Sequence, residues 1–78
     1  MSVVTAYILV KANTGEADRL KAEMSDIRGV ESVHIVAGDV DFFVKVVVEK
    51  PADVKEIVAD SIQAIDGVED TQTYVAMD

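Results

Sequence analysis

The stretch Ile-Arg-Gly-Val-Glu at residues 27–31 recurs as Ile-Asp-Gly-Val-Glu at residues 65–69, 38 positions later. In each copy, apolar residues spaced three or four apart precede the glycine, which is typical of one face of an amphipathic helix. A short run with several β-branched residues follows, which favours a strand. Glycine itself is the residue that most often ends a helix. Since the offset is close to half of the 78 residues, the pattern predicts one unit repeated twice.

The residues around these two turns extend the repeat into six elements. One helix is predicted at Glu16–Ile27, and a second begins at Pro51, a residue favoured in the first helical turn, and closes at Gly67. The predicted strands are Val3–Lys11, Val30–Ala37, Val40–Glu49 and Val68–Met77. The pair Gly38-Asp39 between the middle two strands predicts a two-residue type II′ hairpin turn.

The order β-α-β-β-α-β predicts an α+β fold. Two β-α-β halves with right-handed crossovers interleave into a ferredoxin-like sandwich, a four-stranded antiparallel sheet with both helices on one face. A chain of 78 residues has room for one such core, so residues 1–78 are expected to form a single domain.

Two helices cover only one face of this sheet. Side chains alternate along a strand, so Phe42, Val44, Val46 and Val48 share the face predicted to meet the helices. The same alternation leaves an apolar patch on the other face, made of Tyr7, Leu9, Phe43 and Val47. Such a patch is unusual on a soluble monomer. We therefore expect a homodimer that buries it sheet against sheet.

Composition excludes several classes of function. Fifteen acidic against seven basic residues, a net charge of -8, argue against direct binding of nucleic acid by this chain. The longest apolar run, Ala6–Val10, is far short of the roughly 18 residues that a membrane span needs. The acidic excess fits an ordinary soluble surface and adaptation to a salty cytoplasm equally well, and we expect a cytoplasmic protein.

The chemistry-bearing residues are few. With no cysteine and one histidine, His34, the sequence predicts no zinc or copper site and no Cys/His nucleophile pair. The glycines form no phosphate-binding loop. No catalytic residue, metal or cofactor is therefore expected.

Two polar clusters remain, Gly38–Asp41 at the hairpin and Thr71–Thr73 on the last strand. At the offset of the repeat, hydroxyls at Thr71 and Thr73 replace the aliphatic side chains of Val33 and Ile35. A small zwitterion needs N–H and hydroxyl donors for its carboxylate, and a carboxylate for its ammonium. The two clusters contain that set, although Asp39 and Asp41 also suit a cation.

The chain resembles the effector-binding domain of the Lrp/AsnC transcriptional regulators, also called the domain for regulation of amino acid metabolism (RAM). The likeness covers Val3 to Met77 and is clearest at Ala37–Val46, which is similar to the family's Gly-Asp-aromatic-Asp hairpin, and at Gly67-Val68 followed by Thr71–Thr73. Position 40 departs from the pattern, because valine stands where the family often has tyrosine.

The resemblance implies a non-catalytic module that binds an amino acid as its effector. The residues it implies for the effector are Gly38, Asp39, Val40 and Asp41, with Thr71 and Thr73. It also implies a sheet-to-sheet homodimer and an octamer of four dimers. Because the first strand is predicted to begin near Val3, we expect a stand-alone module without the family's DNA-binding domain, acting through a full-length Lrp/AsnC regulator as its partner.

Two other interpretations remain open from sequence. A small enzyme of the dimeric α+β barrel type, a monooxygenase or isomerase, has the same topology. It would use His34 or Asp41 for proton transfer in a pocket between helices and sheet. An amino-acid-binding domain of the ACT type has the same strand order and differs mainly in where ligands sit and how sheets pair.

Overall fold

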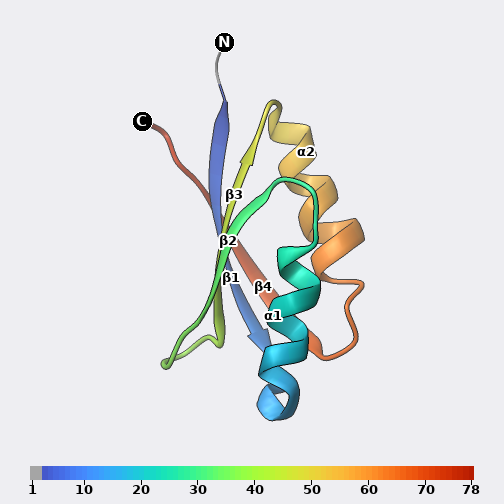
Figure 1. The fold of residues 1–78 in the computed structure, drawn as a ribbon. Helices are drawn as coiled ribbons and strands as arrows, with labels where there is room; N and C mark the ends of the chain where they lie inside the picture. Colours follow the sequence, from blue (N-terminus) through green and yellow to red (C-terminus); the bar gives the residue numbers. More distant parts are fainter. Residues whose placement is uncertain (1–2) are drawn as a thin grey trace.

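A computed structural model describes residues 3–78 and shows a four-stranded antiparallel sheet in the order β2-β3-β1-β4 (Figure 1). Its strands are β1 (Val4–Ala12), β2 (Val30–Ile35), β3 (Phe42–Val48) and β4 (Val68–Val75). Every pairing is antiparallel. The predicted ferredoxin-like fold is confirmed.

Both helices lie on one face of the sheet, and Figure 1 shows them on the same side of the strands. The helical segments are a 3-10 turn η1 (Thr14–Glu16), α1 (Ala17–Ser25), α2 (Pro51–Glu56) and a π-helical continuation η2 (Ile57–Ile62). Pro51 opens α2, as predicted. Among the residues described, no helix is long and apolar enough to cross a membrane.

The core lies between the sheet and the helices. Alternate residues of the central strands, Ala6, Ile8 and Val10 of β1 and Phe42, Val44 and Val46 of β3, are fully buried. Leu20, Met24 and Ile62 cover them from the helices. Strand alternation predicted this face correctly, because a β-strand turns successive side chains to opposite sides.

The second helix departs from the regular spacing that its sequence predicts. The backbone N–H of Gln63 donates to the carbonyl of Val58 at 2.9 Å, a bond five residues back in the chain. A π-turn of this kind brings residues five apart onto one face. Ile57 and Ile62, five residues apart, are both buried.

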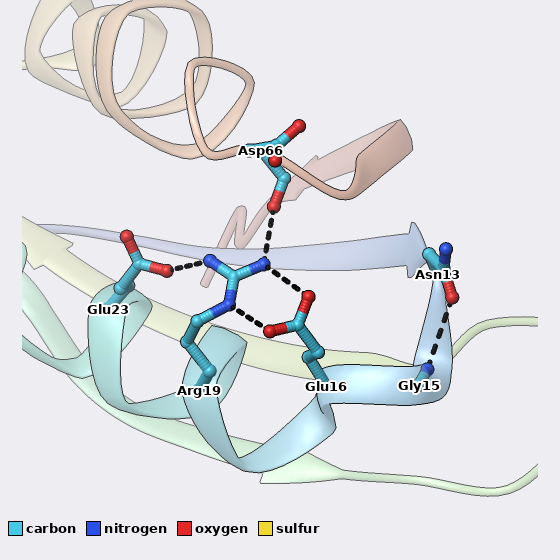
Figure 2. Close-up of polar contacts among 6 residues, drawn as sticks. All are labelled: Asn13, Gly15, Glu16, Arg19, Glu23 and Asp66. Atoms are coloured by element: carbon cyan, nitrogen blue, oxygen red, sulfur yellow. Dashed lines mark hydrogen bonds and ion pairs between the residues drawn. The ribbon is translucent and has the colours of Figure 1, made fainter.

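A polar clamp ties the first helix to the turn before β4 (Figure 2). The Arg19 guanidinium pairs with the carboxylates of Glu16 and Glu23 and donates to the Asp66 carbonyl at 3.0 Å. The hydrogen bond to Glu16 is the main reason that the pKa of Arg19 is raised. The backbone N–H of Asn13 donates to the Gly67 carbonyl at 2.8 Å, so the end of β1 holds the same turn.

The predicted two-residue hairpin at Gly38-Asp39 is wrong. The last bond between the two strands runs from the Val36 N–H to the Asp41 carbonyl at 2.9 Å, which leaves residues 37–40 as the turn. Strand β3 accordingly begins at Phe42 and not at Val40. The physical reason is the backbone at Gly38, whose φ of 152° is far from the roughly +60° that the first central residue of a type II′ turn requires.

Candidate functional site

A cleft opens where the hairpin loop (residues 36–41) lies beside the end of β1 and the start of β4. We call it the hairpin cleft, and its volume is about 300 Å³. Its walls are formed by Leu9, Lys11, Asp39, Val40, Asp70, Thr71 and Gln72. The antiparallel register places Lys11 opposite Asp70 and Leu9 opposite Gln72, so the two strands bring these side chains together.

Asp41 fixes the loop that forms one wall of the cleft. Its carboxylate Oδ2 accepts the backbone N–H of Ala12 at 2.9 Å, next to the irregularity where the β1–β4 register shifts. A carboxylate that accepts a backbone N–H makes one of the stronger protein hydrogen bonds. The half-buried Asp41 therefore positions the loop, and it does not line the cleft.

The structure brings together three of the six residues predicted for the effector. Asp39, Val40 and Thr71 line the hairpin cleft. Gly38 lies exposed at the loop tip with a φ of 152°, a backbone conformation that favours glycine. Asp41 lies behind the loop, as described above.

The two threonines lie on the helix-covered face of the edge strand β4. Thr71 pairs with Val10 and Thr73 with Ile8, whose side chains are both buried there. The Thr71 hydroxyl accepts a hydrogen bond from Gln63 Nε2 at 2.9 Å, at the end of η2. Thr73 instead lines a separate groove beside α2, with Val54 and Val58 among its neighbours. The structure therefore places Thr73 apart from the hairpin cleft.

Sequence reasoning missed Lys11 and Asp70. They lie far apart along the chain and meet only because β1 and β4 pair. The ferredoxin-like topology, which pairs the first and last strands, could have revealed them, since Lys11 ends the first predicted strand and Asp70 is the third residue of the last. The cleft thus has one ammonium beside the carboxylates of Asp39 and Asp70. A zwitterionic ligand requires both signs of charge.

The open face of the sheet carries the predicted apolar patch. Tyr7, Leu9, Phe43 and Val47 all point away from the helices, and the rings of Tyr7 and Phe43 have their centroids 5.7 Å apart. Phe43 is 38% exposed to solvent. On this face Lys45 pairs with Glu31 at 3.1 Å, and the Glu31 carboxylate raises the pKa of Lys45.

His34 is exposed on the open face, opposite Phe43 in the register. A barrel-type enzyme would need this imidazole in a pocket between helices and sheet, and it points to the other side. The other proton-transfer candidate, Asp41, is bonded to the Ala12 N–H. Among the residues described, no group of three or more His, Asp or Glu side chains is placed to hold a metal ion.

Comparison with known proteins identifies the family of this chain. The family model described as the Lrp/AsnC ligand binding domain matches residues 5–78. An uncharacterised HTH-type transcriptional regulator of Pyrococcus abyssi is 39% identical over 77 residues, which cover 95% of this chain and 51% of that protein. The chain therefore spans about half the length of this curated relative.

Solved structures share the fold. A protein of Thermus thermophilus superposes with a TM-score of 0.91 at 24% identity, over 96% of this chain and 94% of that one. A transcriptional regulator of Neisseria meningitidis, solved in complex with L-Met, superposes with a TM-score of 0.82 at 19% identity, over 96% of this chain and 50% of that one. Since the family model covers nearly all of the sequence, this chain belongs to the Lrp/AsnC ligand-binding domain family.

Proposed function

We propose that this chain binds a small amino acid in the hairpin cleft, catalyses no reaction, and acts on transcription through partner regulators. The observation that carries the proposal is the charge arrangement of the cleft, in a member of a ligand-binding family. Lys11 supplies a cation for the carboxylate of an amino acid, and Asp39 and Asp70 supply anions for its ammonium.

The ligand's side chain would lie against the apolar part of the cleft. Leu9 and Val40 form that part, and Gln72 adds an amide. The half-buried valine at position 40 occupies less space than an aromatic ring, so it leaves more room for a side chain. The Neisseria regulator of the same fold was solved with L-Met, an amino acid with an unbranched apolar side chain.

Binding would affect assembly because the cleft opens at the edge of the sheet. In the proposed arrangement, two chains pair through the open face, and dimers associate further, up to an octamer of four dimers, near the hairpin loops. A ligand shifts such an equilibrium by its differential affinity for the assembled and separate states. Partner regulators of the same family would supply the DNA-binding part, in the cytoplasm where transcription takes place.

Thermal unfolding across the twenty amino acids tests this proposal, with light scattering on the same samples. A ligand at about 100 times its dissociation constant stabilises the protein by about 2.7 kcal/mol, which raises the Tm of a small domain by several degrees. We expect one class of amino acid to give this shift and to change the oligomeric state.

The matched variants are Asp39→Asn and Asp18→Asn. Asp39 lines the cleft, whereas Asp18 is exposed in the first turn of α1, and each change removes one negative charge. The Tm shift should be lost in Asp39→Asn and kept in Asp18→Asn. An absence of any shift, or equal shifts in both variants, would contradict binding in the hairpin cleft.

A further inference from the structure

A second groove, larger than the hairpin cleft, lies away from it. We call it the junction groove, and its volume is about 680 Å³. It is lined by the turn after α1 (residues 27–29), the end of β3 (residues 47–49) and five residues of α2 and η2, namely Asp53, Glu56, Ile57, Asp60 and Ser61. The hairpin loop precedes β3 and this groove lies at its far end, so the two sites are at opposite ends of one strand.

The groove lies beside the turn that joins α1 to β2. The last residue of α1 is Ser25, and the chain then crosses beside α2 to start β2 (Figure 1). The apolar lining, which we call the floor, comes from Ile27, Val48 and Ile57. The N–H of Val47 donates to the Gly29 carbonyl at 2.9 Å, which holds the turn against the end of β3. The floor is therefore built into the fold.

One wall of the groove is acidic. Asp53, Glu56 and Asp60 follow one another at intervals of three and four along the second helix, and Glu49 faces them from the end of β3. In the described part of the chain, Arg28 is the one cation that lines the groove. None of these five side chains takes part in the ion pairs found among residues 3–78. Asp53 lies in the first turn of α2, where the helix dipole favours a carboxylate, but like charges three and four apart repel one another along the rest of the row.

The spacing of the carboxylates indicates the shape of the cationic ligand that would neutralise their charge. Among the described residues, no three acidic side chains converge as a metal site requires. The row instead extends along two turns of helix beside an apolar floor. An elongated cation with aliphatic segments matches both features, since lysine and arginine lay their apolar stems on such surfaces and keep their charge in water.

We propose that the junction groove docks a basic, partly apolar segment of a different polypeptide. Alternating lysine or arginine side chains would meet the acidic wall, and the apolar residues between them would cover the floor. A second copy of this chain is a poor occupant, because it also has a net charge of -8. The inference extends the proposed function by naming the surface that engages a partner, and it requires no bound effector.

The test uses the whole chain, labelled with ¹⁵N, and the blocked hexapeptide acetyl-Lys-Leu-Arg-Val-Lys-Leu-amide as the probe. We expect amide shifts confined to residues 27–29, 47–49 and 53–61, with binding that weakens as salt increases. A second probe, acetyl-Lys-Ser-Arg-Ser-Lys-Ser-amide, has the same charge without the apolar residues. It should bind more weakly if the floor contributes.

Two triple variants separate the groove from the general acidity of the protein. Asp53→Asn with Glu56→Gln and Asp60→Asn should weaken the first probe about tenfold, the sum expected for three exposed ion pairs. Asp18→Asn with Glu69→Gln and Asp78→Asn removes the same charge from exposed positions outside the groove and should leave affinity unchanged. Circular dichroism of both variants would verify that the helices remain.

The groove proposal is overturned if the two triple variants lose affinity equally, or if the peptide shifts amides over the whole acidic surface. Failure here is distinguishable from failure of the effector proposal. The groove variant should keep its amino-acid thermal shift, whereas Asp39→Asn should lose that shift and still bind the peptide.

Discussion

At the scale of the residue, Asp41 decides how the hairpin loop is held. Its backbone N–H reaches β1 at Val10, and its carboxylate reaches the N–H of Ala12, so one residue bonds twice to the neighbouring strand. The two aspartates of the Gly-Asp-x-Asp motif therefore have different roles. Asp39 lines the cleft, and Asp41 holds in place the loop that contains Asp39.

Replacing Asp41 by alanine should destabilise the protein. The change removes the acceptor for the N–H of the buried residue Ala12, and an unsatisfied buried donor costs about 1–2 kcal/mol. Urea unfolding should show this loss, with Asp41→Asn between wild type and Asp41→Ala because the amide oxygen still accepts. Asp39→Ala is the control, expected within about 0.5 kcal/mol of wild type. Equal stability of Asp41→Ala and wild type would refute the anchoring role.

The ion pair of Lys45 with Glu31 on the open face makes the stability of the protein depend on pH. The hydrogen bond and charge of Glu31 raise the pKa of Lys45 above its ordinary value of 10.5. A raised pKa in the folded state stabilises the fold at pH values below 10.5, and that contribution is lost as pH rises through the raised pKa. The stability difference between wild type and Glu31→Gln should therefore shrink in alkaline solution.

Urea unfolding of the two proteins across that pH range measures this difference. Glu69→Gln, which neutralises an exposed carboxylate on β4, is the control and should show no such change. A difference that is constant from neutral to strongly alkaline pH would contradict the assigned pair.

At the scale of the element, the repeat places a glycine at each helix-to-strand joint, but the two joints differ in packing. Gly29 and Gly67 have φ values of 98° and 106°, a backbone conformation that strains any other residue. A Cβ on Gly29 would lie 2.8 Å from Ile57 Cδ1 and 3.0 Å from Val48 Cγ1. A Cβ on Gly67 would meet Leu20 at an ordinary 3.5 Å.

Gly29→Ala should consequently destabilise the protein more than Gly67→Ala. Both changes carry backbone strain of about 1 kcal/mol, and overpacking at Gly29 adds about 1–3 kcal/mol. Equilibrium unfolding in urea measures both losses. Shortening the obstructing side chain with Ile57→Val should recover part of the Gly29→Ala loss. Equal losses of stability in Gly29→Ala and Gly67→Ala would contradict the overpacking at Gly29, because they would show that its neighbours move aside without cost.

At the scale of the whole molecule, the sheet is covered on one side only. The helices bury alternate residues of the central strands, while Tyr7, Leu9, Phe43 and Val47 lie on the open face. Stable dimers bury about 800 Å² per partner, an area that one face of a small sheet can supply. We expect the open face to be that interface.

Phe43→Lys should convert the expected homodimer to a monomer at micromolar concentration. The substitution places a second ammonium beside Lys45 in the centre of the expected interface, where an unpaired charge is costly to desolvate. Size-exclusion chromatography with light scattering measures the mass. Met77→Lys, at a position 95% exposed beyond the end of β4, is the control and should remain dimeric. A wild-type monomer, or a Phe43→Lys variant that stays dimeric, would contradict the interface.

The sequence by itself determined the order of the elements, the two glycine joints and the buried face of the central strands. These features depend on local spacing: residues such as Ile8 and Val44 follow the strand period, and Leu20 and Met24 follow the helical one. Thr71 occupies the same position in its half as Val33, and the structure places both on the helix-covered face.

Only the tertiary structure decided the features that depend on contacts between distant segments. The bonds from Asp41 to β1 hold the hairpin loop in place, and the pairing of β1 with β4 brought Lys11 to Asp70. The π-helical segment Ile57–Ile62 departs from the regular α-helical period that a sequence pattern predicts. Thr73 faces α2 and not the cleft, since strand register and helix position together set its surroundings. Short-range pattern predicts secondary structure, but a site depends on which strands become neighbours.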